Sequence, residues 1–339
     1  MEQNRTREQR KYRGGRLAAG YLLGLLLAIA APLAVLLELM WLLPVIVVPA
    51  VGVALIYRWF GRGPALFSAV LQIFVDAAML GAMGMWMAVC ASLLPLIPVL
   101  AASGRPFFEQ LRISIASFAL GALLAVVLLY LSFGGDAIAR LLRLLPEALR
   151  ALPTESVNAT LATLPAGITS GMTVEDFFDS FGKAIEALIP VYQYNLPGLI
   201  FGGSLISALL CTPLLAMARG GDCAPLRTWA LPASTTGGLL LSLAVSYILE
   251  ACGVRGGDVA FQAVLDVTAI AFCVQALASM ARRLHMAGRS RGMQRGLVAV
   301  IAVLAYCGAS LYLAIYGCAS AIFGSRGALK QRPHKDSNK

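Results

Sequence analysis

The sequence predicts an all-α fold, a polytopic integral membrane bundle of about nine transmembrane helices, and three observations carry this prediction. Hydrophobic residues make up 59% of the 339 residues, and charged residues only 13%. The mean hydropathy of +0.79 does not fit a chain that folds around one water-soluble core. Apolar runs long enough to cross a hydrocarbon layer, which takes about 20 helical residues, recur without the period-two alternation of a membrane barrel.

The first five spans are expected in residues 17–133. The run from Leu17 to Tyr57 is about twice the length of one span, and its prolines offer places where two helices divide. The run from Gly63 to Ser103 is again of double length and should split around Gly81 to Gly84. Ile113–Phe133 then predicts the fifth span.

Residues 134–188 are expected to form the one sizeable extramembrane region, outside the cytoplasm. Residues 135–152 place leucines at helical spacing on one face and arginines on the other, as in a helix that lies on a membrane surface. A second amphipathic helix should begin at Thr173, which can act as an N-cap with Asp176 three residues later. Two interfacial helices packed over the bundle are the main interpretation, and a substrate lid is the alternative.

The remaining spans are expected at residues 189–217, 233–251, 259–280 and 297–319, which together form a C-terminal bundle of four spans, residues 189–319. Basic tails flank the two bundles. Residues 1–16 should form a cytoplasmic tail, and residues 320–339 a disordered one.

Short loops rich in Lys and Arg stay on the cytoplasmic side, so the N-terminus and the loop from Arg282 to Arg295 should face the cytoplasm. Nine crossings would then leave the basic C-terminal tail outside. Either this tail escapes the rule, or one of the nine segments does not cross and the protein has eight spans.

Polar side chains inside the expected spans indicate a candidate intramembrane polar pocket. Asp76 lies in the third span, where an aspartate at the centre of the membrane costs about 3 kcal/mol, so it should face the bundle. The candidate pocket consists of Asp76, Gln72, Asp266, Gln262 and Gln275. One shared polar pocket and two independent structural hydrogen bonds remain open as alternatives.

Two further features concern packing and anchoring. Gly20, Gly24 and Ala28 form a stripe of small residues in the first span, which suits either a docking partner or ordinary helix packing within the chain. The segment from Pro225 to Pro232 should form a cytoplasmic elbow before the seventh span. In it, Arg227 and Trp229 are expected to anchor the chain at the membrane interface, because Trp favours that zone.

The sequence does not point to an enzyme, a metal or a cofactor. The two histidines, His285 and His334, both lie in basic extramembrane stretches, and the seven cysteines show no paired spacing. No glycine loop of the phosphate-binding type is present, and neither intramembrane aspartate lies in a glycine-containing motif of membrane aspartyl proteases. Basic residues are scattered over loops, which argues against nucleic-acid binding, so the expected surroundings are a lipid bilayer.

The order of three segments, Tyr57–Val70, Pro225–Pro232 and Asp266–Leu284, resembles the YybS-like proteins, a family of bacterial membrane proteins of unknown function. The N-terminal half is also similar to the substrate-binding components of energy-coupling-factor vitamin transporters and to the rod-shape-determining membrane protein. The resemblance implies a multi-pass protein of the bacterial inner membrane. One relative implies a transporter-like component that binds a small solute and works with a membrane coupling partner and an ATPase, and the other implies a non-catalytic scaffold for the cell envelope.

Overall fold

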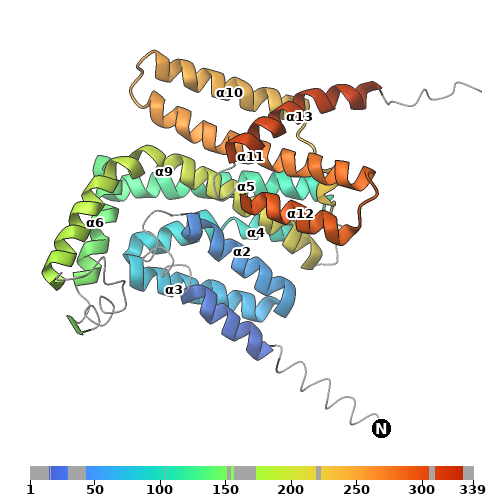
Figure 1. Cartoon of the computed structure of the whole chain (residues 1–339). Coiled ribbons are helices and arrows are strands. Elements are labelled where there is room, and N and C mark those ends of the chain that lie inside the picture. The colour runs from blue at the N-terminus through green and yellow to red at the C-terminus, as the bar shows by residue number, and fades with distance from the viewer. Residues whose placement is uncertain are drawn as a thin grey trace, which may run out of the picture. The chain divides into compact units, whose positions relative to one another are not determined.

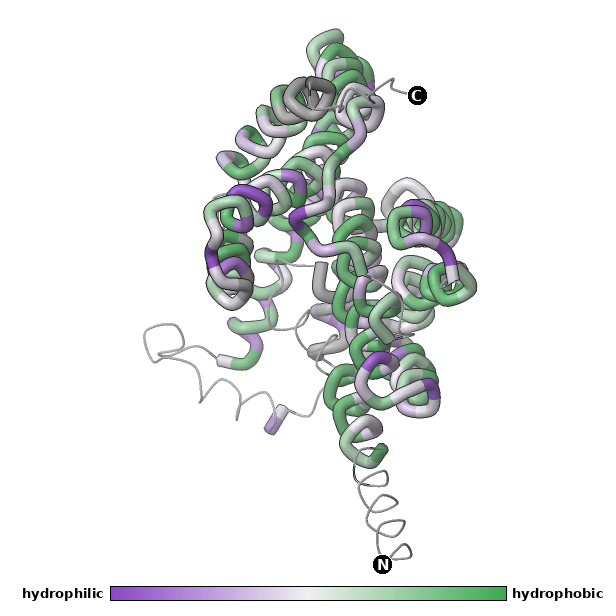
Figure 2. Tube along the Cα trace, turned by 90° about the vertical axis from the view of Figure 1, so that its right-hand side faces the viewer, coloured by the Kyte–Doolittle hydropathy of each residue, from purple (hydrophilic) through white to green (hydrophobic). Residues whose placement is uncertain are grey.

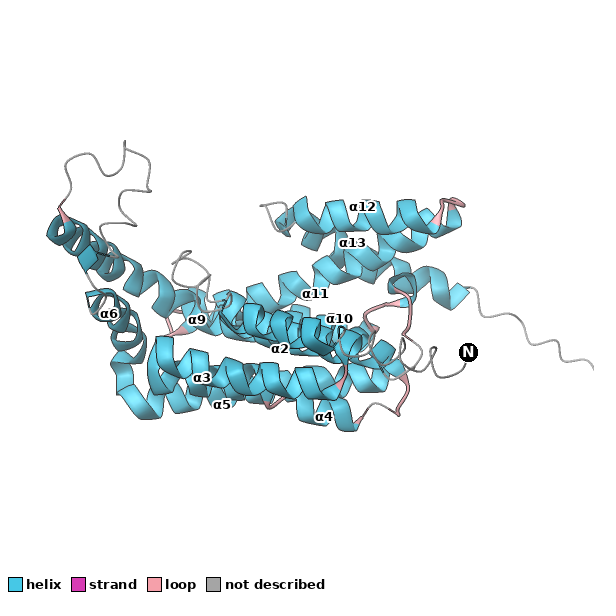
Figure 3. Cartoon of the chain, turned by 90° about the horizontal axis from the view of Figure 1, so that it is seen from below, coloured by secondary structure: helices cyan, strands magenta, loops and turns pink. Residues whose placement is uncertain are grey.

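The computed structural model describes residues 15, 17–29, 43–102, 104–150, 154–155, 173–218, 223–304 and 310–330. All regular secondary structure in these ranges is helical, which confirms the all-α prediction for them (Figures 1 and 3). The chain divides into two compact units, Met1–Gly221 (unit 1) and Asp222–Lys339 (unit 2). Residues 1–14 and 331–339 of the predicted basic tails lie outside the described residues.

Five described helices are long and apolar enough to cross a membrane, so the protein has the composition of a membrane protein, but a count of nine spans is not confirmed. They are Gly84–Ala101, Phe107–Phe133, Val174–Ala218, Ala233–Ala251 and Gly257–Met286, and shorter apolar helices lie at Leu17–Ile29, Val47–Phe60 and Ser310–Phe323. Hydrophobic residues dominate the helices (Figure 2). Large apolar side chains such as Leu66 and Leu131 are 68% and 77% exposed, a pattern that suits contact with lipid.

Unit 1 contains helix Leu17–Ile29, α2 (Leu43–Phe60), α3 (Arg62–Met87), the π-helix η1 (Ala88–Leu93), α4 (Leu96–Ala101), α5 (Phe107–Phe133), the 3-10 turn η2 (Gly134–Asp136), α6 (Ala137–Arg150) and α9 (Val174–Ala218). The first double-length run forms two helices, as predicted, with residues 30–42 outside the described residues. The second run breaks at Gly81, where a φ of 70° leaves the helical region. Glycine adopts this conformation readily, which explains the predicted break.

The amphipathic helix predicted at Thr173 and the sixth span are not separate, because both belong to α9. This helix has 45 residues, about 67 Å at 1.5 Å per residue, against a hydrocarbon thickness of about 30 Å. Its predicted cap is confirmed, since the Thr173 hydroxyl accepts a hydrogen bond from the Asp176 amide at 3.1 Å, and the Asp176 carboxylate accepts one from the Thr173 amide at 3.0 Å. Pro190, Pro197 and Pro213 lie inside α9, which changes direction along its length instead of ending (Figure 1).

The other predicted amphipathic helix is confirmed as α6, which packs against the first part of α9. Leu142 is buried while Arg140 and Arg150 are exposed, as the predicted faces require. The Arg143 guanidinium donates to both carboxylate oxygens of Glu186, at 2.7 and 3.0 Å. Figure 1 shows this helix pair running across the direction of α5, which suits the interfacial interpretation.

The ion pair between α6 and α9 should weaken in acid. The hydrogen bonds from Arg143 hold the pKa of Glu186 below its usual value of 4.5, in a part of α9 that is expected outside the membrane. Because the pKa is lowered in the folded state, the stabilisation is present above about pH 4.5 and is lost as the pH falls through the lowered value. Spin labels on Arg140→Cys and Lys183→Cys, in a background without native cysteines, should report a broader distance distribution below that pH. An Arg143→Gln protein should already show the broad distance distribution at neutral pH. A narrow distribution in the Arg143 protein at low pH and in Arg143→Gln at neutral pH would contradict the expectation.

The sixth span belongs with the N-terminal helices and not with the predicted C-terminal bundle, because α9 packs mainly against α2 and α5. Phe118 of α5 lies at the centre of this contact and is fully buried. It packs in one cluster with Ala50 and Ala54 of α2 and with Ala208, Cys211 and Leu215 of α9. Burial of these side chains fixes α9 in unit 1.

Unit 2 contains the 3-10 turn η3 (Leu226–Thr228), α10 (Ala233–Ala251), α11 (Gly257–Met286), α12 (Arg291–Leu304) and α13 (Ser310–Lys330). The predicted ninth span, residues 297–319, falls on α12 and α13, and residues 305–309 between them lie outside the described residues, so a single span there is not confirmed. Helix α13 also continues past Ala319 into the predicted disordered tail. Both helices pack on α11.

Helix α13 crosses the middle of α11. Helix α12 begins shortly after the last residue of α11, whereas α13 begins at the middle of α11, where the Cys273 thiol donates to the Ser310 carbonyl at 3.3 Å. Gly317 of α13 also lies at the middle of α11, where a Cβ would meet the Phe272 carbonyl, and the Arg283 guanidinium lies 5.6 Å from the centre of the neighbouring Tyr316 ring.

The C-terminal tail is rich in Lys and Arg, so it should lie on the same side of the membrane as the loop before α12, which corresponds to the alternative of eight crossings. Cysteines introduced at Ser337 and at Arg289 should both react with a membrane-impermeant maleimide from the cytoplasmic side of inverted vesicles. A cysteine at Glu175 should react from the other side and serves as the control. Labelling of Ser337→Cys from the outside only would show that α12 and α13 together cross the membrane.

Candidate functional site

The first predicted polar pair is formed within α3 of unit 1. The Gln72 amide nitrogen lies 3.2 Å from each carboxylate oxygen of Asp76 and donates to them. Ser68, Gln72 and Asp76 are 2%, 2% and 1% exposed. They follow one another at four-residue spacing, which places them on one helix face, so α3 carries a buried polar row.

A second pair of the same pattern lies in α11 of unit 2, where the Gln262 amide donates to Asp266 at 3.0 Å. Both side chains are half-buried. Gln275, the fifth predicted pocket residue, serves a different purpose, because its side-chain oxygen accepts a hydrogen bond from the Leu231 amide at 3.0 Å. The structure thus brings together Gln72 with Asp76 and Gln262 with Asp266, and one pocket shared by both aspartates stays a prediction.

The small-residue stripe of helix Leu17–Ile29 is buried within unit 1. A Cβ on Gly20 would lie 2.7 Å from the Phe60 Cβ, and one on Gly24 would lie 3.1 Å from the Ser68 Cβ. Ala28 is fully buried. The stripe therefore packs against the end of α2 and the start of α3. This agrees with the interpretation of ordinary helix packing within the chain, and this face is not open to a docking partner.

The predicted elbow is present and is held by α11. Residues 223–232 have no α-helical structure and lead into α10. The Arg282 guanidinium donates to the carbonyls of Arg227 and Trp229 at 3.1 and 3.0 Å. The Trp229 indole N–H donates to the Ala224 carbonyl at 2.9 Å. Arg227 and Trp229 thus position the elbow through their backbone carbonyls, and their role at a membrane interface stays a prediction.

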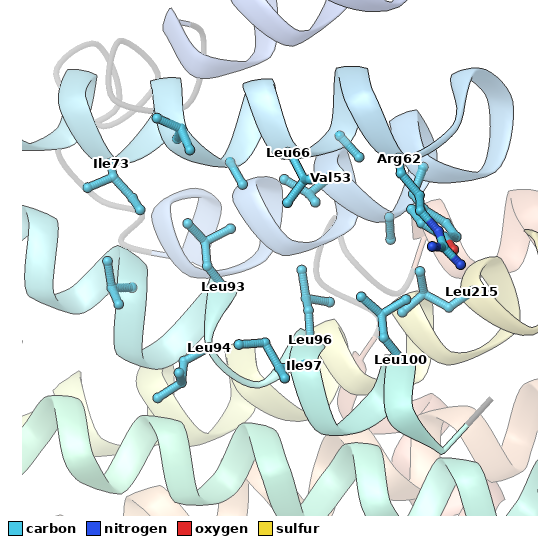
Figure 4. Close-up of a pocket in the computed structure, with 16 residues that line it drawn as sticks. Val53, Arg62, Leu66, Ile73, Leu93, Leu94, Leu96, Ile97, Leu100 and Leu215 are labelled. Carbon is cyan, nitrogen blue, oxygen red and sulfur yellow. The ribbon is translucent and has the colours of Figure 1, made fainter.

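Unit 1 also contains an apolar groove of about 400 Å³ that the sequence did not indicate (Figure 4). Its walls come from α2, α3, η1, α4 and α9, and nearly all of its lining residues are aliphatic. Leu66 of α3 and Ile97 of α4 line the groove and are 68% and 62% exposed, so it opens sideways between these two helices. In a membrane this opening would face lipid.

The groove has one charged end. Arg62, the first residue of α3, lies at that end near Leu100 and Leu215, whereas Ile73 lies at the other (Figure 4). Asp76 does not line the groove and lies three residues beyond Ile73 on α3. The predicted polar row and the groove are therefore neighbouring but distinct features of one helix.

Comparison of the chain with protein-family models, with curated proteins and with solved structures found no match. The candidate site therefore has to be interpreted from its own geometry.

Proposed function

We propose that this chain is a non-enzymatic, transporter-like membrane component that binds a small apolar solute in the groove of unit 1. The groove is the observation that carries the proposal. Its volume of about 400 Å³ lies within the range of about 300 to 1,000 Å³ that is typical of small-molecule sites. Its aliphatic walls suit a ligand that gains free energy by leaving water or by packing closely.

The proposal includes a location in the bacterial inner membrane with a cytoplasmic N-terminus. Arg58 at the end of α2, Arg62 at the start of α3 and Arg105 before α5 lie at the helix ends that alternation would place in the cytoplasm. A solute would then enter from the bilayer through the opening between α3 and α4. A coupling partner and an ATPase remain part of the transporter-like proposal, and they would bind a surface other than the buried stripe.

The proposal can be tested by filling the groove. Ala69 lines it, so Ala69→Phe should occupy the space, whereas Ala78→Phe adds the same ring at an exposed position of α3. Both proteins, reconstituted in phosphatidylcholine nanodiscs, would be photolabelled with a diazirine derivative of hexadecanol, and the labelled residues would be identified by mass spectrometry. We expect labelling between Arg62 and Leu100 to fall several-fold in Ala69→Phe only.

Equal labelling of this region in the wild-type protein, Ala69→Phe and Ala78→Phe would overturn the proposal. That result would favour the alternative, a non-catalytic scaffold of the cell envelope, which requires no solute site. Correct folding of each variant would be checked by its elution as a single species and by an unchanged midpoint of thermal unfolding.

A further inference from the structure

We infer that the ligand of this groove is an anionic amphiphile, an apolar chain with a carboxylate or phosphate head that binds the Arg62 guanidinium. The inference rests on the proposed function and names the ligand class of the same site. It depends on three properties of the groove: its elongated shape, its single charge, which is in none of the ion pairs found among the described residues, and the position of that charge at one end.

The shape favours a chain. Arg62 and Ile73 mark the two ends of the groove along α3 (Figure 4), and the helix between them is about 16 Å long at 1.5 Å per residue. Valine, leucine, isoleucine and alanine side chains dominate the walls along this length. A compact polar solute would leave its hydrogen-bonding groups without partners there, whereas a hydrocarbon chain would not.

The charge favours an anionic head. Arg62 is the one charged residue among the 16 that line the groove, and no carboxylate is among them. The ion pairs found among the described residues do not include Arg62, and its side chain is exposed. A guanidinium has five donors in a planar fork that matches the oxygens of a carboxylate or phosphate.

The position of Arg62 at one end of the groove also suits an amphiphile. An amphiphile in a bilayer keeps its head at the interface and its chain in the hydrocarbon, and the groove has the same polarity, with Arg62 at the expected cytoplasmic end of α3 and aliphatic walls beyond it. Because Leu66 and Ile97 leave the side of the groove open, the chain could enter from one leaflet without its head crossing the hydrocarbon.

The test compares two photoactivatable probes with the same chain, hexadecyl sulfate, which stays ionised, and hexadecanol, which is neutral. The full-length protein in phosphatidylcholine nanodiscs would be labelled in its wild-type form and as Arg62→Gln, Arg62→Lys and Arg58→Gln. Arg58→Gln is the matched control, because Arg58 is an exposed arginine in the last turn of α2 that does not line the groove.

We expect the wild-type groove to prefer the sulfate over the alcohol by about tenfold, since a hydrogen bond between two charged groups is stronger than one to a neutral hydroxyl. Arg62→Gln should abolish this preference without reducing labelling by the alcohol, while Arg58→Gln and Arg62→Lys should retain most of it. Equal labelling by both probes in wild type and Arg62→Gln would overturn the anionic ligand and leave the proposed function standing. Absence of labelling by either probe would instead overturn the proposed function.

Discussion

Replacing Gly317 with alanine should lower the stability of unit 2 by about 1 to 3 kcal/mol, the usual cost of forcing extra atoms into a packed contact. A Cβ at this position would overlap the backbone carbonyl oxygen of Phe272 and lie 3.1 Å from the Ala276 nitrogen. Both atoms belong to the backbone of α11 and cannot rotate away. The only relief is a separation of α13 from α11, which are in close contact here.

Two readouts would measure the effect. The midpoint of thermal unfolding should fall, and Cys273, whose thiol faces the Ser310 carbonyl of α13, should react faster with a maleimide, as followed by peptide mass spectrometry. Gly238→Ala in α10 is the control, because nothing lies within 4 Å of its Cβ and alanine favours a helix by about 1 kcal/mol over glycine. Unchanged stability and Cys273 reactivity in Gly317→Ala would show that the helices can move apart at no cost.

Local sequence signals predicted the elements whose limits are set by local chemistry. Apolar length identified helices that are long enough to cross a membrane, Gly81 marked a real break because its backbone has a positive φ, and Thr173 and Asp176 form the expected cap. Hydrogen bonds between residues four apart, such as Gln72 to Asp76, also follow directly from helical spacing.

Features set by tertiary contact were not predictable in the same way. Nothing in the sequence ends α9 at residue 188, because proline is tolerated where neighbouring helices support the backbone. The prediction treated residues 297–319 as one helix, whereas the described residues of this apolar run belong to α12 and α13. The groove is lined by aliphatic residues from five elements, and each of them alone resembles an ordinary core or lipid-facing residue.

Arg282→Met should release the elbow from α11. The Arg282 side chain is half-buried and holds two backbone carbonyls, those of Arg227 and Trp229. These carbonyls lie in and just after the 3-10 turn η3, ahead of α10, and each loses its hydrogen bond to the guanidinium when that group is removed. Hydrogen bonds to a charged group contribute about 1.5 to 3 kcal/mol each, and methionine keeps most of the apolar stem of the side chain.

Trypsin provides a local measurement, because the peptide bond after Arg227 lies within the held segment. When opening and closing are fast, cleavage follows the population of the open form, so each 1.4 kcal/mol lost should raise the rate about tenfold. Arg283→Met is the matched control, since Arg283 is adjacent in sequence but lies over the Tyr316 ring of α13. Gln275→Leu should add to the effect, because Gln275 holds Leu231 at the other end of the elbow. If Arg282→Met and Arg283→Met are cleaved after Arg227 at the same rate as the wild type, the two carbonyl contacts do not restrain the elbow, and Gln275 becomes the main contact to test.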